Sequence, residues 1–246
     1  SNFNVDAFLL ASKNKKSKES VTIANKILDG TTDIKQLHSD HAGFLLMNLG
    51  KVRAFISHAE EAHFQSIEPE TLVPLPADDD FLPFESEIYE WLRAAQSVTK
   101  EDRSLIHLRI EGRTDIGKSS LLLSLERFFR QYHVPLEEDF YCEWDDNAYD
   151  LVVFDEFQCQ KTITWMNRFT DGMNCPLKRK GAQTARHRRK TPCVILSNYT
   201  WDDSYHKLAQ FKPAILDTVK RRFKTILIPE EENLFKIINY INQINQ

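Results

Sequence analysis

LIHLRIEGRTDIGKSSLLLS, residues 105–124, is the stretch that decides the predicted fold. Its first part, Leu105–Ile110, is an apolar run that predicts a strand. The segment from Ser119 to Gln131 is rich in Leu and Phe and predicts a helix. Between them, Gly112–Ser119 matches the pattern G-x-x-x-x-G-K-[ST] in the strand–loop–helix context that it requires. An ordinary βα turn could match by chance, but the flanking elements favour a phosphate-binding loop in an α/β fold.

The chemistry of such a loop explains its residue types. Glycines let backbone N–H groups wrap around phosphates, and the helix that follows adds the favourable dipole of its N-terminus. Lys118 is expected to reach the β- and γ-phosphates of ATP, and the Ser119 hydroxyl to bind Mg²⁺. The residues that we expect to bind the nucleotide are Gly112, Arg113, Thr114, Asp115, Ile116, Gly117, Lys118, Ser119 and Ser120.

Two further apolar runs end in residues that suit ATP hydrolysis. Asp155 and Glu156 follow Leu151–Phe154. The first acid is expected to help hold Mg²⁺, and the second to polarise the attacking water. Asn198 follows Cys193–Leu196, where its amide can reach the γ-phosphate and that water. Taken alone, the acids could be a solvated strand end and the asparagine a plain turn residue. Ligands of open α/β sheets, however, bind at the carboxyl ends of the strands.

The rest of the chain predicts a mostly parallel sheet with helices on both faces. Thr225–Ile228 predicts a strand, whereas Pro213–Lys220 and residues 231–243 predict helices. Phe44–Glu61 and Ser86–Gln96 also predict helices, with a proline-containing linker between them. We expect four parts: a helical domain at 1–65, a linker and leading helix at 66–100, an ATPase core at 101–230 and a C-terminal helix at 231–246.

Composition narrows the class of protein. The chain has 246 residues, of which 41% are hydrophobic and 28% charged, as in ordinary soluble domains. Its apolar runs all fall short of the ~20 residues that span a bilayer, so we expect no membrane partner. The four cysteines lack zinc-site spacing and suit a reducing compartment. The net charge is −4, yet residues 178–190 hold seven Lys or Arg and no acid. Such a run suits nucleic acid, a nuclear localisation signal or merely a solvated loop.

Taken together, these motifs resemble superfamily 3 helicases, over about residues 105–228. The phosphate loop, Asp155-Glu156 and Val194–Asn198 stand in that family's order and compact spacing. Where the family has a lysine-bearing hairpin, this chain has Asp171-Gly172 and Leu177–Gly181. The likeness is nearest to the replication-associated proteins (Rep) of circovirus-like viruses, as further indicated by Trp144, Tyr149, Lys180-Gly181 and Arg221-Arg222.

The resemblance implies a P-loop, AAA+-like sheet, hexameric rings with nucleotide between subunits, and DNA in a central channel. Lys178 and Lys180 are then expected to contact DNA, with His187 and Arg188 as weaker candidates. Arg221 or Arg222 would be an arginine finger that reaches the neighbour's nucleotide. Alternatively, either arginine could merely interact with the negative end of the dipole of the preceding helix.

The predicted function is therefore an ATP-dependent DNA helicase motor that uses ATP and Mg²⁺. Its expected partners are single-stranded DNA and copies of itself, which assemble through residues 1–65. The alternatives are an RNA-stimulated ATPase of picornavirus type and an ATP-gated DNA-binding assembly factor that does not unwind. The family's nickase motifs find no match in this chain; if the parent protein has a nickase domain, it is expected before residue 1. The expected location is the host nucleus for a viral protein and the cytoplasm otherwise, without secretion.

Overall fold

A computed structural model describes most of the chain, in two compact units, Ser1–Glu68 and Pro69–Gln246. The described ranges are 15–29, 33–66, 68–76, 80–99, 104–181 and 183–244. Residues 1–14 of the predicted helical domain and position 182 of the basic stretch lie outside them. Nearly all of the predicted segments 66–100 and 231–246 falls in the second unit, together with the predicted core 101–230.

The first unit contains the helices α2 (Lys15–Leu28), α3 (Ile34–Asp40) and α4 (Ala42–Ser66). Asp33 caps α3 by accepting a hydrogen bond of 2.7 Å from the backbone N–H of Gln36. Among the residues that the structure describes in this unit, Ile23, Leu37, Leu45 and Val52 form a buried core cluster. The predicted helix Phe44–Glu61 is confirmed within α4.

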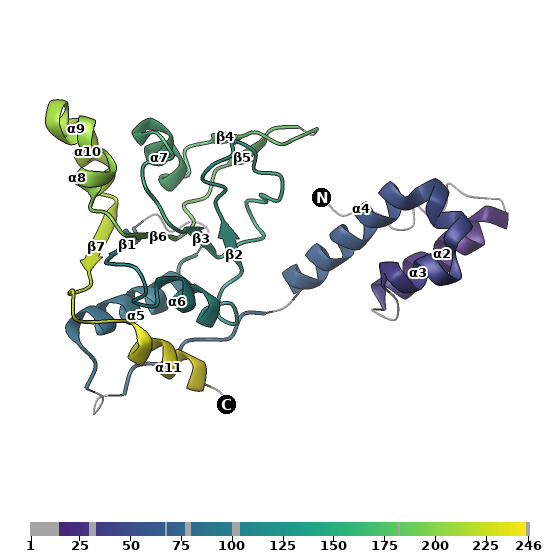
Figure 1. The fold of residues 1–246 in the computed structure, drawn as a ribbon, viewed down its shortest axis with the longest axis horizontal. Coiled ribbons are helices and arrows are strands. Elements are labelled where there is room, and N and C mark those ends of the chain that lie inside the picture. The colour runs from purple at the N-terminus through teal and green to yellow at the C-terminus, as the bar shows by residue number, and fades with distance from the viewer. Residues whose placement is uncertain are drawn as a thin grey trace. The chain divides into compact units, whose positions relative to one another are not determined.

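The second unit is built on a five-stranded sheet in the order β2-β3-β6-β1-β7, in which all neighbouring strands are parallel (Figure 1). The strands are β1 (His107–Glu111), β2 (Gln131–His133), β3 (Leu151–Phe154), β6 (Cys193–Ser197) and β7 (Phe223–Leu227). This confirms the predicted parallel sheet. Because β6 lies between β1 and β3, the carboxyl ends of these three strands are neighbours.

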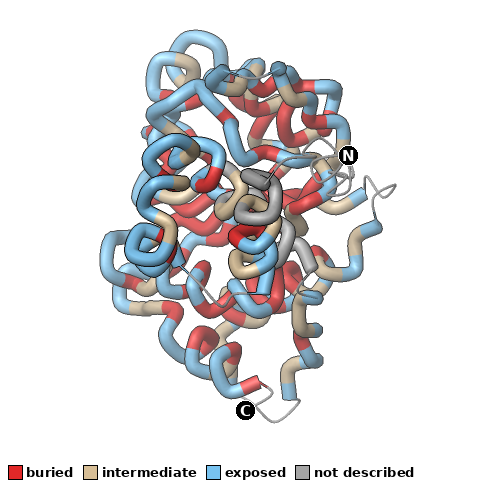
Figure 2. Tube along the Cα trace, turned by 90° about the vertical axis from the view of Figure 1, so that its right-hand side faces the viewer, coloured by how far each residue is buried: buried red, intermediate tan, exposed pale blue. Residues whose placement is uncertain are grey.

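Helices cover both faces of the sheet, because side chains alternate along each strand. In β6, Val194 and Leu196 join one core cluster, whereas Cys193 and Ile195 join the other. The first cluster includes α5 (Pro83–Gln96), α6 (Lys118–Ser124) and α11 (Phe235–Gln243). The second includes α7 (Ile163–Thr170), α8 (Trp201–Ser204), α9 (His206–Phe211) and α10 (Pro213–Lys220). Buried positions recur along the helices and strands, between exposed and intermediate ones (Figure 2).

The helix predicted over Ser119–Gln131 is wrong in length. It ends at Ser124 as α6, and the chain then turns and starts β2 at Gln131. The side-chain amide of Gln131 donates to the Leu122 carbonyl at 2.8 Å, which helps to close the helix end. Phe128 and Phe129 are buried within the turns. The prediction was too long because these buried phenylalanines extend the apolar sequence pattern past the end of the helix.

A two-stranded hairpin carries the basic stretch. Its strands β4 (Cys175–Leu177) and β5 (Ala185–His187) are antiparallel, and they lie on the side of the sheet with α7 (Figure 1). The family resemblance implied a hairpin in this stretch without giving strand bounds, whereas α7 to α9 were not predicted. None of the described helices combines the length and apolar character needed to cross a membrane.

Candidate active site

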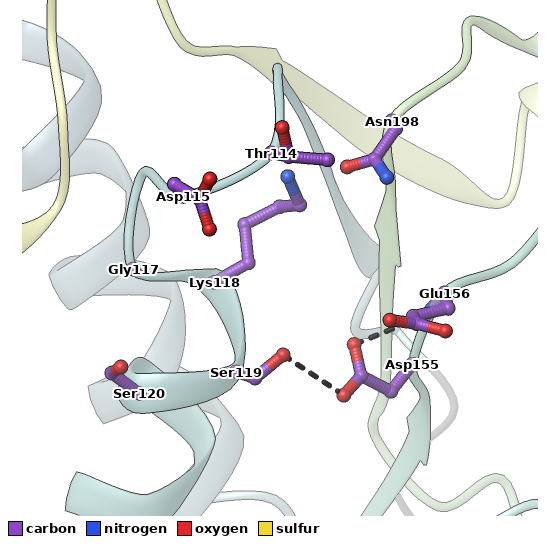
Figure 3. Close-up of a pocket in the computed structure, with 9 residues that line it drawn as sticks. All are labelled: Thr114, Asp115, Gly117, Lys118, Ser119, Ser120, Asp155, Glu156 and Asn198. Carbon is purple, nitrogen blue, oxygen red and sulfur yellow. Dashed lines mark hydrogen bonds between the residues drawn. The ribbon is translucent and has the colours of Figure 1, made fainter.

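Residues from three adjacent strand ends line one cavity of about 220 Å³ (Figure 3). The phosphate loop follows β1, the acidic pair follows β3, and Asn198 follows β6. The lining residues are Thr114, Asp115, Gly117, Lys118, Ser119, Ser120, Asp155, Glu156 and Asn198. The sheet therefore brings together the loop, the acids and the asparagine, which lie far apart in the sequence.

The loop needs its glycines for close approach and for backbone shape. A Cβ at Gly112 would lie 2.6 Å from Cδ1 of Ile116 and 3.2 Å from Cβ of Ile228, so both neighbours would have to shift to admit a side chain. Gly117 has φ 92°, a left-handed conformation that glycine adopts without strain. Asp115 is also left-handed, with φ 62°. Aspartate is among the residues that tolerate this region.

Lys118 is the cation of the cavity. Its Nζ donates to the backbone carbonyls of Gly112 at 2.8 Å and Arg113 at 2.6 Å, which holds the ammonium over the loop. In Figure 3 the amine points toward Thr114 and Asn198. Burial lowers the pKa of Lys118, and the nearby carboxylate of Asp155 opposes that shift. An anion entering the cavity would meet this ammonium.

The acidic pair touches the start of α6. The hydroxyl of Ser119 donates to Oδ2 of Asp155 at 3.1 Å, and the backbone N–H of Glu156 donates to Oδ1 of the same carboxylate at 3.0 Å (Figure 3). A hydroxyl and a carboxylate side by side are hard oxygen ligands of the type that Mg²⁺ prefers. Ser119 and Asp155 therefore fit the predicted magnesium site.

Three of the predicted loop residues shape the loop without lining the cavity. Ile116 is buried, with 1% of its surface exposed, and packs in the core. The Nε of Arg113 donates to the backbone carbonyl of Glu230 at 2.8 Å, which ties the loop to the chain after β7. Gly112 donates its backbone N–H to the Ser197 carbonyl at 3.2 Å. This last bond joins the loop directly to the strand that carries Asn198.

The two predicted finger arginines differ in their surroundings. Arg222 forms a two-pronged ion pair with Asp171, through Nε at 2.9 Å and Nη2 at 2.6 Å. Arg221 is exposed, and its Nε donates to the Asp217 carbonyl at 3.3 Å. Both precede β7 and so lie at the amino end of a parallel strand, whereas the cavity lies at the carboxyl ends. Neither arginine lines the cavity of its own chain.

The hairpin separates the predicted DNA contacts. Lys178, Lys180 and Arg188 are exposed. His187 is fully buried, and its Nδ1 donates to Oδ1 of Asp146 at 2.7 Å, so its prediction as a DNA contact is wrong in this fold. Side chains alternate along β5, so His187 faces inward while its neighbours face outward.

Arg186 is a candidate that the sequence analysis missed. It is exposed on β5, one residue before His187. The signal that could have found it is the same period of two, which pairs Arg186 with Arg188 on the outer side of the strand.

Two buried charges beside the cavity were also missed. Arg109 and Glu111, both on β1, form an ion pair of 2.5 Å with 0% and 7% of their side chains exposed. Because side chains alternate along a strand, Arg109, Glu111 and His107 point to one face of the sheet, and the apolar Leu108 and Ile110 point to the other. Their two-residue spacing was the available signal in the sequence.

No protein-family model and no curated protein matches the sequence. Among solved structures, a candidate primosome component from Streptococcus pyogenes serotype M3 is 12% identical and has a TM-score of 0.43, with 70% of this chain and 97% of that chain covered. The JCV helicase, in complex with a small molecule, is 15% identical and has a TM-score of 0.37. That match covers 90% of this chain and 61% of the helicase chain. At such low scores neither likeness supports a functional argument, and the likeness to circovirus-type proteins stays a prediction.

Proposed function

We propose that the second unit is a magnesium-dependent ATPase that drives movement along single-stranded DNA, in the manner of a superfamily 3 helicase. The observation that carries the proposal is the single cavity that collects Lys118, Ser119, Asp155, Glu156 and Asn198 from three strand ends. A loop with backbone N–H groups, one ammonium and paired carboxylates suits a metal-bound triphosphate.

Each group has a role in this proposal. Lys118 neutralises the β- and γ-phosphates, while Ser119 and Asp155 hold Mg²⁺, which supplies charge neutralisation at the phosphate oxygens. Glu156 accepts a proton from the attacking water, and Asn198 orients that water. Arg221 of a neighbouring copy completes the site, since a guanidinium stabilises charge that develops on the γ-phosphate. Arg221 is preferred over Arg222 because the latter is committed to Asp171.

The DNA-binding part of the proposal rests on the hairpin. Lys178, Lys180, Arg186 and Arg188 are exposed on or next to β4 and β5. A row of cations without a counterbalancing acid in 178–190 suits a phosphodiester backbone, whose binding is independent of base sequence.

The self-assembly part rests on the first unit. Leu46 and Met47 on α4 have 84% and 81% of their surface exposed, whereas Leu45 and Val52 of the same helix are buried. Adjacent apolar side chains at this exposure suit a contact with another protein surface. We therefore assign residues 1–65 to association between copies.

The test is ATP hydrolysis by the wild type and by Lys118→Ala, each with and without single-stranded DNA. We expect DNA-stimulated hydrolysis that Lys118→Ala abolishes, while Lys224→Ala, which removes an exposed lysine of β7, leaves it intact. Stimulation by RNA alone contradicts the DNA assignment. Hydrolysis without strand displacement contradicts the motor and favours the assembly factor.

A further inference from the structure

Arg109 is a buried cation three residues before Gly112, the first residue of the phosphate loop. None of its surface is exposed, and its guanidinium lies 4.1 Å from the centre of the Trp201 ring. Burial lowers the pKa of Arg109, while the carboxylate of Glu111 opposes that shift. An apolar side chain of similar volume could fill the same space without removing a charge from water. Packing alone therefore does not explain this residue.

The contacts of the guanidinium join the two sides of the cavity. Its Nε donates to Oε1 of Glu111 at 2.5 Å, and its Nη2 donates to the backbone carbonyl of Tyr199 at 2.6 Å. Glu111 is the last residue before Gly112 of the phosphate loop, and Tyr199 is the first residue after Asn198. One rigid, planar group thus spans the strand that enters the loop and the turn that carries the asparagine.

Further bonds close the turn around Asn198. The Ser197 hydroxyl donates to the Phe157 carbonyl at 2.7 Å and accepts from the Tyr199 N–H at 3.1 Å. The Asn198 side chain lines the cavity, and hydrogen bonds outside the cavity hold the residues on either side of it, Ser197 and Tyr199. A second contact of Arg109, from Nη2 to Oγ of Ser204 at 3.4 Å, reaches α8.

We propose that Arg109 is a positioning residue for ATP hydrolysis, which fixes the turn bearing Asn198 relative to the phosphate loop and links both to α8. The inference rests on the proposed function. Loss of the guanidinium releases the Tyr199 carbonyl and lets the Asn198 amide move, whereas the groups that bind the phosphates stay in place. A misplaced catalytic group reduces the rate of the chemical step far more than it reduces affinity.

The test compares kcat and KM for ATP in the wild type, Arg109→Met, Asn198→Ala and the double variant. We expect Arg109→Met to lower kcat by about 10- to 100-fold, with KM and the affinity for a non-hydrolysable ATP analogue changed by less than about threefold. Because Arg109 acts through Asn198, the double variant should be no slower than the slower single variant.

Arg130→Met is the matched control, since Arg130 forms an ion pair with Asp150 at 2.7 Å beside the amino ends of β2 and β3. It should leave kcat and KM unchanged. An unaffected kcat in Arg109→Met overturns the inference, as does a double variant whose losses multiply. The inference is also overturned if Arg109→Met lowers kcat and nucleotide affinity by similar factors and lowers the melting temperature as well. That result would show a general structural role.

Arg109→Lys covers the case in which Arg109→Met does not fold. It keeps the charge but lacks the planar fork that contacts Glu111 and Tyr199 together. Reduced kcat with unchanged KM supports the inference, and unchanged kcat overturns it. A wild type that hydrolyses no ATP overturns both this inference and the proposed function. An active wild type with an unaffected Arg109 variant overturns the inference alone.

Discussion

Glu156 and Asp155 share the cavity but not the same surroundings. Asp155 accepts a hydrogen bond from Ser119 on α6, whereas Glu156 is exposed and takes a left-handed φ of 53°. The backbone thus turns between the two carboxylates, which gives each its own direction in the cavity (Figure 3). This difference suits a metal ligand next to a general base.

Glu156→Gln should therefore separate binding from hydrolysis. The amide keeps the shape of the side chain but accepts no proton, so we expect kcat for ATP to fall by about 10²- to 10⁴-fold. ATP affinity, measured with a fluorescent analogue, should stay within a few-fold of the wild type. The exposed Glu143→Gln is the control and should be fully active. Strand displacement that survives Glu156→Gln would show that hydrolysis is not the driving step.

His107 connects three elements as a neutral, buried side chain. Its Nδ1 accepts from the Cys193 N–H at 3.1 Å, and its Nε2 donates to the Thr170 carbonyl at 2.9 Å. Desolvation by burial lowers the pKa of His107 to about 4, from 6.5. Below pH 6.5 the histidine is protonated in the unfolded chain but stays neutral in the folded chain. The free energy of unfolding therefore falls with pH until the pH reaches about 4, where the folded chain is protonated as well.

We expect the free energy of unfolding to fall by about 3 kcal/mol between pH 6.5 and pH 4 because of His107. The measurement is denaturant unfolding of the wild type and His107→Gln at several pH values in this window. The variant keeps a donor and an acceptor without titrating, so its stability should fall less steeply with acid. His133→Gln, at an exposed histidine, should follow the wild-type curve. Parallel curves for wild type and His107→Gln would contradict the assignment.

At the scale of elements, the hairpin has an anchored base and a charged outer surface. His187 stacks on Phe169 of α7, with ring centres 4.5 Å apart, and donates to Asp146. The same carboxylate accepts from the Arg188 N–H at 3.0 Å. The inner side of β5 therefore holds the hairpin against the second core cluster, while its outer side remains available to a ligand.

The double variant Lys178→Ala/Lys180→Ala should weaken binding of single-stranded DNA and make it less sensitive to salt. Loss of two phosphate contacts flattens the slope of log K against log salt by about 1.4. Fluorescence anisotropy over a salt series measures this. Lys207→Ala/Lys212→Ala removes two exposed lysines at α9 and should keep the wild-type slope. A slope unchanged by the hairpin variant would exclude these lysines from the DNA interface.

At the scale of the whole molecule, the proposal is that a second copy completes the site. Among the described residues that line the cavity there is no arginine, and Arg221 lies toward the opposite ends of the strands. A head-to-tail contact between copies would bring the arginine of one chain to the cavity of the next. Activity would then belong to the interface between copies.

Mixing two inactive variants tests this arrangement. Arg221→Ala keeps the loop and lacks the finger, whereas Lys118→Ala keeps the finger and lacks the loop lysine. Random assembly of equal amounts places an intact loop next to an intact finger at about a quarter of head-to-tail interfaces, so about a quarter of wild-type ATPase activity should return. Arg222→Ala should instead lower the melting temperature, because it breaks the pair with Asp171. A mixture that stays inactive would contradict a finger supplied in trans.

Local sequence was sufficient for four of the five strands of the sheet, β1, β3, β6 and β7, and for most of the cavity. β3 and β6 are short, continuous apolar runs because parallel strands are buried on both faces, and this property is visible without any tertiary contact. The phosphate loop is likewise local, since its glycines and lysine act within eight consecutive residues. Once three strands were predicted to be parallel, their carboxyl ends had to meet at one edge, which placed Asp155, Glu156 and Asn198 beside the loop.

Tertiary structure decided which charged side chains face solvent. His187 and Arg188 are neighbours in one basic run, yet one is buried against Asp146 and the other is exposed. Arg222 pairs with Asp171, which lies 51 positions away in the chain, whereas Arg221 donates to the nearby Asp217 carbonyl. In the sequence, Arg109 only interrupts an apolar strand. The structure shows that it contacts the Tyr199 carbonyl and the Trp201 ring. Periodicity records the local backbone, whereas the partner of a buried charge depends on where distant segments pack, and only the folded chain determines that.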